Sequence, residues 1–346
     1  MEASDLGQLL SAKQDRRIRV IENLLRGKKT VSTLYWGQRY HLLPLLNLAK
    51  QLDRGGLDNA VQDLQQRDWL TVDAEQKTLR LTDQGAQALT KIPAYRPVTV
   101  DHWVNLDMLA ARQRLLLAVQ VTSQYAHSTA QYYPLATDQE TRRHVRQWFH
   151  GAKGPDLAPT LAQALVASLQ QLPASTADIM TDQFTGFDQP GLTLEQLALA
   201  HQTTLWQVRL RQFDGVTQIA RDARHPEHPL HDLLTPLWRV PVSVSAQATL
   251  AAVAAGGDLQ QVANRRKIKL STVREHLLEA AIMLPLTDFP YDSVLPQSVR
   301  TEFQAAVQGN LDDWQYSALP QAMQDRYDFF YFRLYAIWRI KQEVTA

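Results

Sequence analysis

The amino-acid sequence predicts a mainly helical protein with several domains. Apolar residues recur at helical spacing along most of the 346 residues, and few stretches alternate apolar and polar side chains. Ala, Leu and Gln, which favour helices, are frequent. Hydrophobic residues make up 45% of the chain, so a core is ample without a metal or a disulfide, and the length suits two or three domains.

The first expected element is a helix followed by a short β-hairpin and a second helix. Residues 57–67 place apolar side chains at helical spacing, and two β-favouring stretches follow at 69–72 and 78–81, separated by a polar turn. Thr82 is then a good N-cap for the next helix. This order, with the strings DWL and LTDQG around the hairpin, is typical of a winged-helix domain. We expect such a unit, with one β-hairpin, in residues 1–95.

Proline-rich breaks divide the remainder of the chain. Pro93 and Pro97 mark a first linker, after which residues 96–172 are expected to form a helical middle region. A break at Pro173 opens a second helical region over residues 173–240, which ends in an expected linker, HPEHPLHDLLTP.

The string LTLEQLALAHQTTLWQVRLR in this region has the form of a helix, a turn and a second helix. Thr193 is a good N-cap for the first helix, Leu197 lies on its apolar face, and Val208 lies in the second helix. A second helix-turn-helix and an ordinary helical hairpin explain this string equally well.

The last expected domain, residues 241–346, contains the most informative string, SAQATLAAVAAGGDLQQVANRRKIKLSTVREHLLEAAI. Gly256 and Gly257 are expected to end a first helix, because glycine accepts a left-handed backbone at low cost. Asp258 is a strong N-cap for a second helix, and Ser271 is expected to cap a third. Three helices in this order predict a helix-turn-helix domain, with the third helix in the position that reads DNA.

Cations gather around the turn between the second and third of these helices. Five of the ten residues from 265 to 274 are Lys or Arg, whereas the whole chain has a net charge of +1. Such a cluster is typical of a surface that contacts phosphates, and a solvated basic turn is the alternative. The candidate DNA-binding residues are Arg265, Arg266, Lys267, Lys269, Ser271, Thr272, Arg274 and His276.

Two acidic side chains lie one turn apart on the third helix, Glu275 and Glu279. Glutamate can accept a hydrogen bond from cytosine, but two carboxylates on one exposed face would repel phosphate. They therefore indicate a weak or sequence-independent DNA binder, or a surface that binds protein.

The pattern T-L-x2-V-x2-G-G-D-L-x2-V-A-x2-R-x-I-K-x-S-T-V-x-E-H-L resembles the helicase helix-turn-helix domain. That domain lies at the C-terminus of some RecQ-type helicases and in stand-alone YpbB-like proteins of Gram-positive bacteria. The matching residues are Thr249, Leu250, Gly256, Leu259, Val262, Ala263, Arg266, Ile268, Lys269, Ser271, Thr272, Val273, Glu275, His276 and Leu277. Residues 123–149 are similar to the middle of YpbB-like proteins, and the hairpin with LTDQG is similar to their N-terminal part.

This resemblance implies a bacterial, non-catalytic DNA-binding accessory protein that pairs with a separately encoded RecQ-type helicase in replication, recombination or repair. The alternative is a helix-turn-helix transcriptional regulator, since STVREHL is also similar to the recognition helix of LuxR-type regulators. Those regulators carry this helix in a short terminal domain, whereas a long segment follows it here. A protein scaffold that binds no DNA is a third hypothesis.

An enzyme is the function we expect least. The chain has no G-x4-G-K-[ST] phosphate loop, no catalytic constellation that rises above chance, and too little length for two helicase motor domains. The absence of cysteine excludes disulfides, zinc–thiolate fingers and thiol catalysis. We expect no cofactor and no small-molecule substrate.

The N-terminal string MEASDLGQLL does not have the pattern of a secretory signal, and no apolar run is long enough for a membrane span. We therefore expect a cytoplasmic protein without membrane contact. His225, His228 and His231 have a spacing compatible with metal binding, but the intervening prolines deny them a helical scaffold. We expect a polar linker there and no metal.

Two helical faces can each be interpreted in two ways. Arg142 and Arg146 lie on one face of an expected helix, as a second phosphate-contacting strip or as an ordinary solvated face. The C-terminal stripe of Tyr327, Phe330, Tyr331, Leu334 and Trp338 is expected to pack in the core, with a partner-binding face as the alternative.

Overall fold

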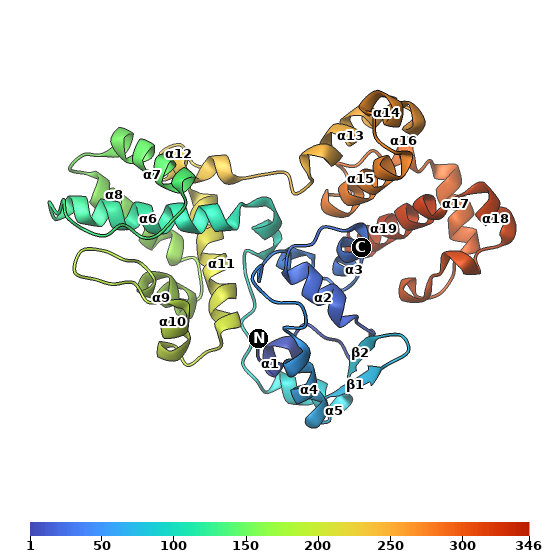
Figure 1. The fold of residues 1–346 in the computed structure, drawn as a ribbon, viewed down its shortest axis with the longest axis horizontal. Helices are drawn as coiled ribbons and strands as arrows, with labels where there is room; N and C mark the ends of the chain where they lie inside the picture. Colours follow the sequence, from blue (N-terminus) through green and yellow to red (C-terminus); the bar gives the residue numbers. More distant parts are fainter. Residues whose placement is uncertain (346) are drawn as a thin grey trace. The chain divides into compact units, whose positions relative to one another are not determined.

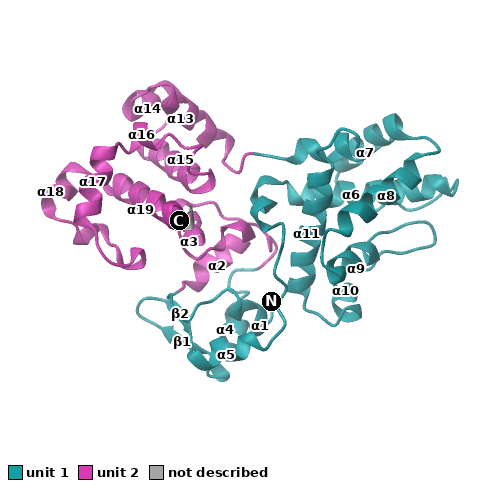
Figure 2. Cartoon of the chain, turned by 180° about the vertical axis from the view of Figure 1, so that it is seen from behind, with its two compact units in different colours: residues 1–15, 53–239 teal, residues 16–52, 240–346 magenta. Residues whose placement is uncertain are grey.

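The computed structural model describes residues 1–345. This part of the chain is mainly helical, with one two-stranded antiparallel β-hairpin, which confirms the predicted fold class in these features. The chain divides into two compact units, each built from two separate stretches of sequence (Figures 1 and 2). Unit 1 comprises residues 1–15 and 53–239, and unit 2 comprises residues 16–52 and 240–346.

The two units do not follow the four consecutive domains expected from the sequence, because residues 16–52 pack with the C-terminal stretch. The four-domain division and the winged-helix character of residues 1–95 stay predictions, since compactness does not test which segments fold alone. The units differ in charge. Unit 2 holds 18 Lys and Arg against 12 Asp and Glu, a net charge of +6, and unit 1 holds 18 against 23, a net charge of −5.

Unit 1 carries the hairpin together with helices that precede and follow it (Figure 1). Its elements are α1 (Ala3–Gly7), α4 (Asp58–Gln66), β1 (Leu70–Asp73), β2 (Thr78–Leu81), α5 (Asp83–Thr90), η2 (Val100–Asn105), α6 (Met108–Ala126), α7 (Gln139–Ala152), α8 (Leu157–Leu169), α9 (Ala174–Asp182), α10 (Leu194–Ala200), α11 (Leu205–Asp222), α12 (His231–Leu234) and η3 (Thr235–Leu237).

The hairpin forms where the sequence predicts it. Leu70 pairs with Leu81 across the two strands, and both side chains are buried. The Thr82 hydroxyl accepts a hydrogen bond from the Gly85 N–H at 3.0 Å, which confirms the predicted cap of α5. A Cβ at Gly85 would lie 2.3 Å from the Trp69 carbonyl oxygen, so α5 can approach the hairpin this closely only through a glycine.

Helix α11 forms the centre of the rest of unit 1, where it packs against α6, α8, α9 and α10. Its Asp214 is fully buried and fixes the segment that leads into η2. The carboxylate accepts hydrogen bonds from the Tyr95 hydroxyl at 2.6 Å, the Val98 N–H at 2.7 Å, and both the N–H and the hydroxyl of Thr99, at 2.9 and 2.6 Å. Four donors on one buried carboxylate offset the cost of burying its charge.

The stretch expected as a third linker is instead packed into unit 1. Leu230, Leu233 and Leu234 are almost fully buried. The Trp148 indole N–H donates to the Pro229 carbonyl at 2.8 Å, and the Arg114 guanidinium donates to the Leu233 carbonyl at 3.1 Å. The linker interpretation is wrong because leucines between the prolines supply apolar surface that α6 and α7 cover.

Unit 2 combines an N-terminal helical pair with the C-terminal helices (Figure 2). Its elements are α2 (Ile18–Leu25), α3 (Val31–Arg39), η1 (Leu43–Leu45), α13 (Val244–Ala254), α14 (Leu259–Arg266), α15 (Leu270–Met283), α16 (Tyr291–Val294), α17 (Gln297–Ala306), η4 (Leu311–Asp313), η5 (Tyr316–Ala318), α18 (Gln321–Arg326) and α19 (Phe329–Thr345).

Helix α15 is the packing centre of unit 2, in contact with α13, α14, α19 and α3. The predicted aromatic stripe supplies much of the surrounding core, since Tyr327, Phe330 and Leu334 are buried. Phe329 alone in this stretch keeps about half of its surface exposed, at 47%. Within residues 1–345, no helix has the length and apolarity needed to cross a membrane.

Candidate nucleic-acid interface

The start of the predicted DNA-binding domain folds as its local signals indicate. Gly256 ends α13 with a left-handed φ of +88°. The Asp258 carboxylate caps α14 by accepting the N–H groups of Gln260 at 2.8 Å and Gln261 at 3.3 Å. Both predictions are confirmed, because each depends on the backbone conformation of one residue and its near neighbours.

The turn between α14 and α15 differs from the prediction. Lys267 ends α14 in the left-handed conformation, with φ 54° and ψ 43°. Helix α15 begins at Leu270 and has Lys269, not Ser271, as its N-cap residue, with no side-chain hydrogen bond at the cap. The left-handed Lys267 reverses the chain early enough for the Lys269 carbonyl to accept the N–H groups of Thr272 and Val273. Ser271 therefore lies exposed in the first turn of α15.

Three of the predicted cations remain available to a ligand. Arg265, Lys267 and Lys269 are exposed, and their side chains make no hydrogen bond or ion pair within the described part of the chain. They surround the N-terminus of α15, whose first backbone N–H groups and helix dipole favour an anion. These three residues form what we call the turn cluster.

Arg266 has a structural role inside the domain. Its guanidinium donates to the Ser245 carbonyl at 2.8 Å, to the Ser245 hydroxyl at 3.3 Å, and to the Thr249 hydroxyl. Because Thr249 is fully buried on α13, Arg266 joins α14 to α13 rather than facing solvent alone.

His276 and Arg274 are likewise occupied by neighbours. The His276 Nδ1 lies 2.7 Å from the Thr249 hydroxyl, and burial, with the nearby Arg266 charge, lowers the pKa of the imidazole. His276 is therefore neutral at pH 7 and contributes no positive charge toward phosphate. Arg274 forms an ion pair with Asp328 at 2.5 Å and lies 5.9 Å from the centre of the Phe330 ring.

The two glutamates of α15 do not share an exposed face. Glu279 is buried, and its carboxylate accepts the N–H of Ser243 at 2.7 Å and the Ser243 hydroxyl at 3.0 Å. Only Glu275 is exposed near Ser271. Of the two carboxylates expected to repel phosphate, only that of Glu275 faces solvent. The carboxylate of Glu279 instead fixes the start of α13 against α15.

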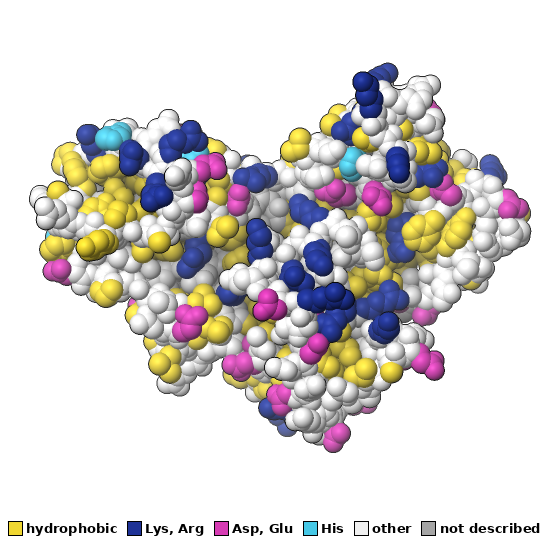
Figure 3. All heavy atoms as spheres, viewed as in Figure 1, with side chains coloured by type: hydrophobic (Ala, Val, Ile, Leu, Met, Phe, Trp, Pro, Cys, Tyr) yellow, Lys and Arg dark blue, Asp and Glu magenta, His cyan; other side chains and the backbone are white. Residues whose placement is uncertain are grey.

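A basic segment that we did not select from the sequence lies in the same unit. Residues 16–52 contain eight Lys or Arg and one acidic residue, Glu22. The Arg17 guanidinium lies over the Trp36 ring at 4.7 Å, and the Lys29 ammonium donates to the Pro241 carbonyl at 3.3 Å. Figure 3 shows dark blue side chains gathered over α2 and, separately, over α14. The run RRIRVIENLLRGKK carried this signal, but its place beside the C-terminal domain is not visible in the sequence.

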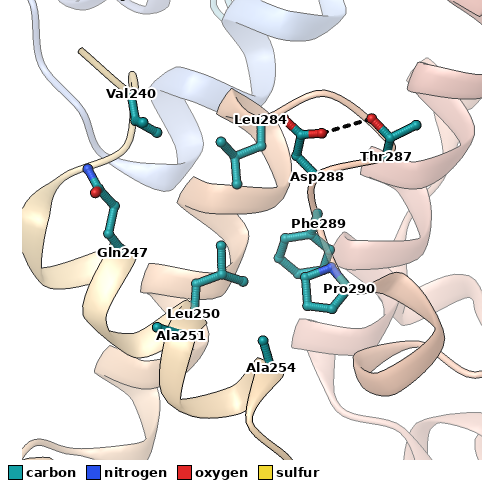
Figure 4. Close-up of a pocket in the computed structure, with 10 residues that line it drawn as sticks. All are labelled: Val240, Gln247, Leu250, Ala251, Ala254, Leu284, Thr287, Asp288, Phe289 and Pro290. Atoms are coloured by element: carbon teal, nitrogen blue, oxygen red, sulfur yellow. Dashed lines mark hydrogen bonds between the residues drawn. The ribbon is translucent and has the colours of Figure 1, made fainter.

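A shallow groove of about 370 Å³ lies between α13 and the segment that follows α15 (Figure 4). Its lining is mostly apolar, with Leu250 and Phe289 among the labelled side chains. Asp288 is the one ionisable side chain in this lining, and it accepts a hydrogen bond from the Thr287 hydroxyl at 2.9 Å. These residues do not form an acid–base pair, so the groove does not suggest a reaction.

The histidines singled out in the sequence are used inside unit 1. His228 Nδ1 accepts the Leu230 N–H at 3.1 Å, and His231 Nδ1 lies 2.9 Å from the Ala223 carbonyl oxygen. In residues 1–345, no group of three or more His, Asp or Glu side chains has a geometry that could hold a metal ion.

The fold and the turn cluster define a protein with a C-terminal helix-turn-helix domain. A protein family described as a helix-turn-helix domain matches residues 245–336, which run from α13 into α19. Over nearly its full length the chain is similar to Protein YpbB of Bacillus subtilis (strain 168), with 24% identity over 329 residues that cover 92% of each chain. No solved structure matches the chain. The expected similarity to YpbB and the C-terminal helix-turn-helix are thus confirmed.

Proposed function

We propose that this protein is a cytoplasmic, non-catalytic DNA-binding accessory protein that partners a RecQ-type helicase in replication, recombination or repair. The observation that carries the DNA-binding part is the turn cluster, in which Arg265, Lys267 and Lys269 lie exposed around the N-terminus of α15. The matched helix-turn-helix family and the net charge of +6 on unit 2 support the same assignment.

The geometry favours contact with the DNA backbone over extensive base reading. The second half of α15, from Leu277 to Met283, is buried in unit 2, so the side chains of α15 that reach solvent lie in its first half. That half offers the exposed hydroxyl of Ser271, the half-buried hydroxyl of Thr272 and the exposed carboxylate of Glu275. Phosphate contacts position a protein on DNA without specifying its sequence, which suits a protein that delivers a helicase to many sites.

The helicase partnership rests on the resemblance of residues 249–277 to the domain that RecQ-type helicases carry at their C-terminus. The test is co-purification of the full-length protein with the RecQ-type helicase of its own cell, before and after nuclease treatment. A complex that survives nuclease treatment supports direct pairing. A complex lost with the DNA, or no complex, overturns the partnership while leaving the DNA-binding assignment in place.

A transcriptional regulator is the second candidate, and the exposed Ser271 and Glu275 favour it because such side chains can read base edges. A regulator should discriminate one duplex sequence from random duplex by roughly 1,000-fold or more at physiological salt. Selection from a random duplex library distinguishes the two candidates. Enrichment of one motif with such discrimination supports the regulator, and recovery without a motif supports the accessory protein.

A further inference from the structure

We propose that unit 1 carries a second nucleic-acid surface, formed by one face of α7 and the end of α6, that binds a single-stranded nucleic acid through its backbone and its unstacked bases. This surface is separate from the turn cluster, which lies in unit 2. We call it the α7 platform and define it by Arg142, Arg146, Phe149, Lys153 and Tyr125.

The inner face of α7 fixes the orientation of the helix. Val145 and Trp148 are buried, and the Trp148 indole N–H donates to the Pro229 carbonyl at 2.8 Å. The Asp138 carboxylate caps the helix by accepting the N–H and the hydroxyl of Thr141, at 2.8 and 2.7 Å. The outer face is therefore presented by a rigid element rather than by a loop.

The outer face of α7 carries cations that no carboxylate neutralises. Arg142 and Arg146 lie one turn apart on one face of α7, Lys153 follows directly after the last residue of the helix, and all three are exposed. Within residues 1–345, their side chains have no hydrogen-bond or ion-pair partner. From Arg142 to Lys153 the strip extends for about 16 Å.

Aromatic rings lie within the same surface. Phe149 occupies the i+7 position on the face that begins at Arg142, and its ring packs edge-on against Tyr125 of α6, with 5.3 Å between the ring centres. Tyr125 is 42% exposed, so part of its ring remains open to solvent. Figure 3 shows basic, histidine and hydrophobic side chains gathered together over the region of α7.

More aromatic side chains flank the end of α6. His127 stacks on Phe187 with 4.4 Å between ring centres and 14° between planes, and Phe187 is 38% exposed. Tyr133, in the segment that joins α6 to α7, is 96% exposed. The Ser123 hydroxyl accepts the Phe187 N–H at 3.0 Å, which holds that ring beside α6.

The combination of exposed rings and unpaired cations selects a single strand over a duplex. Cations follow the phosphates of any nucleic acid, but a base can stack on a protein ring only when it is not already stacked in a double helix. Proteins that bind single strands without sequence preference join these two elements in one site of roughly 4–16 nucleotides.

The test is binding of the full-length protein to an oligothymidylate of about 15 nucleotides. In the charge variant Arg142→Gln/Arg146→Gln, we expect affinity to fall by about tenfold and the salt dependence, as the slope of log affinity against log salt, to fall by about 1.4. In Tyr125→Leu, we expect an affinity loss of about tenfold with the salt dependence unchanged, because only stacking is removed. Both variants should bind a DNA duplex as the wild type does.

A matched control, Lys13→Gln/Arg54→Gln, removes the same charge from exposed positions elsewhere in unit 1 and should bind the oligothymidylate normally. Oligothymidylate binding that is absent in the wild type, or unchanged in the charge variant, overturns the proposal. The proposal is also overturned if the charge variant keeps its affinity for the oligothymidylate and loses its affinity for anionic phospholipid vesicles. Because both charged positions are exposed, this variant remains informative even if Tyr125→Leu does not fold. If the wild type binds the oligothymidylate through the α7 platform but binds no DNA duplex, the proposed function is contradicted and the present inference is not.

Discussion

At the scale of single residues, position in the basic run does not decide which cations can bind DNA. Arg266 and Lys269 are three residues apart, but Arg266 is bonded to Ser245 and Thr249, whereas Lys269 is exposed at the start of α15. A cation already held by protein acceptors must break those bonds before it can bind a phosphate, so the two substitutions should have different consequences.

We expect Arg266→Gln to lower the free energy of unfolding of unit 2 by about 1–2 kcal/mol, because the Thr249 and Ser245 acceptors lose a charged donor. Lys269→Gln should leave stability within about 0.5 kcal/mol and reduce the salt dependence of DNA binding by about 1. Urea unfolding and DNA titrations at several salt concentrations measure both effects. Equal stability losses would contradict the structural role of Arg266.

Protonation of His276 should destabilise unit 2. Burial and the Arg266 charge lower the pKa of its imidazole, so the unfolded chain binds a proton more readily than the folded one. The stability contribution is therefore complete above the unfolded pKa of about 6.5 and is lost as the pH falls from there toward the folded pKa. We expect His276→Gln to reduce the loss of unfolding free energy between pH 7 and pH 5. A variant with the same pH profile as the wild type would contradict this.

At the scale of elements, the turn between α14 and α15 contains a residue that is poorly suited to its backbone. Lys267 has a φ of 54°, a left-handed conformation in which glycine has no steric penalty. We expect Lys267→Gly to raise the free energy of unfolding by about 0.5–1 kcal/mol, measured by urea unfolding. The same change should weaken DNA binding, which would indicate that lysine is kept there for its charge. A variant that gains stability and keeps the wild-type affinity for DNA would contradict a contact between Lys267 and DNA.

Asp214 should be the most sensitive single position in unit 1, because four donors converge on its buried carboxylate. Asp214→Ala leaves those donors unsatisfied, and we expect a loss of about 3 kcal/mol in the free energy of unfolding. Thermal unfolding measures it, and Asp222→Ala, on the same helix but less buried, is the control. Similar losses in both variants would contradict the anchoring role of Asp214.

Elements with local signals were the ones that could be predicted from the sequence. The caps Thr82, Thr193 and Asp258 and the glycine end of α13 each depend on a few adjacent residues. The start of α15 was misplaced by two residues because the left-handed Lys267 has no sequence signature. The burial of Glu279, the ties of Arg266 and the packing of residues 16–52 into unit 2 involve partners distant in sequence, which periodicity does not encode.

At the scale of the whole molecule, charge is separated between the two units. A chain with a net charge of +1 contains one unit of +6, which holds the helix-turn-helix domain, and one of −5. Eight of the basic residues of unit 2 come from residues 16–52, near the N-terminus. The net charge of the whole chain therefore does not reveal that unit 2 is basic. This unit can attract DNA over a distance, most strongly at low salt concentration.

The most direct test of DNA binding is the salt dependence of affinity for a forked DNA, compared between the wild type and the turn-cluster variant Arg265→Gln/Lys267→Gln/Lys269→Gln. The control Lys13→Gln/Arg54→Gln/Lys91→Gln removes the same charge from exposed positions of unit 1. We expect the turn-cluster variant alone to lose about 10–100-fold in affinity and about 3 in the slope of log affinity against log salt. Wild-type affinity and slope in the turn-cluster variant, or equal losses in the control, would contradict a DNA interface at the start of α15.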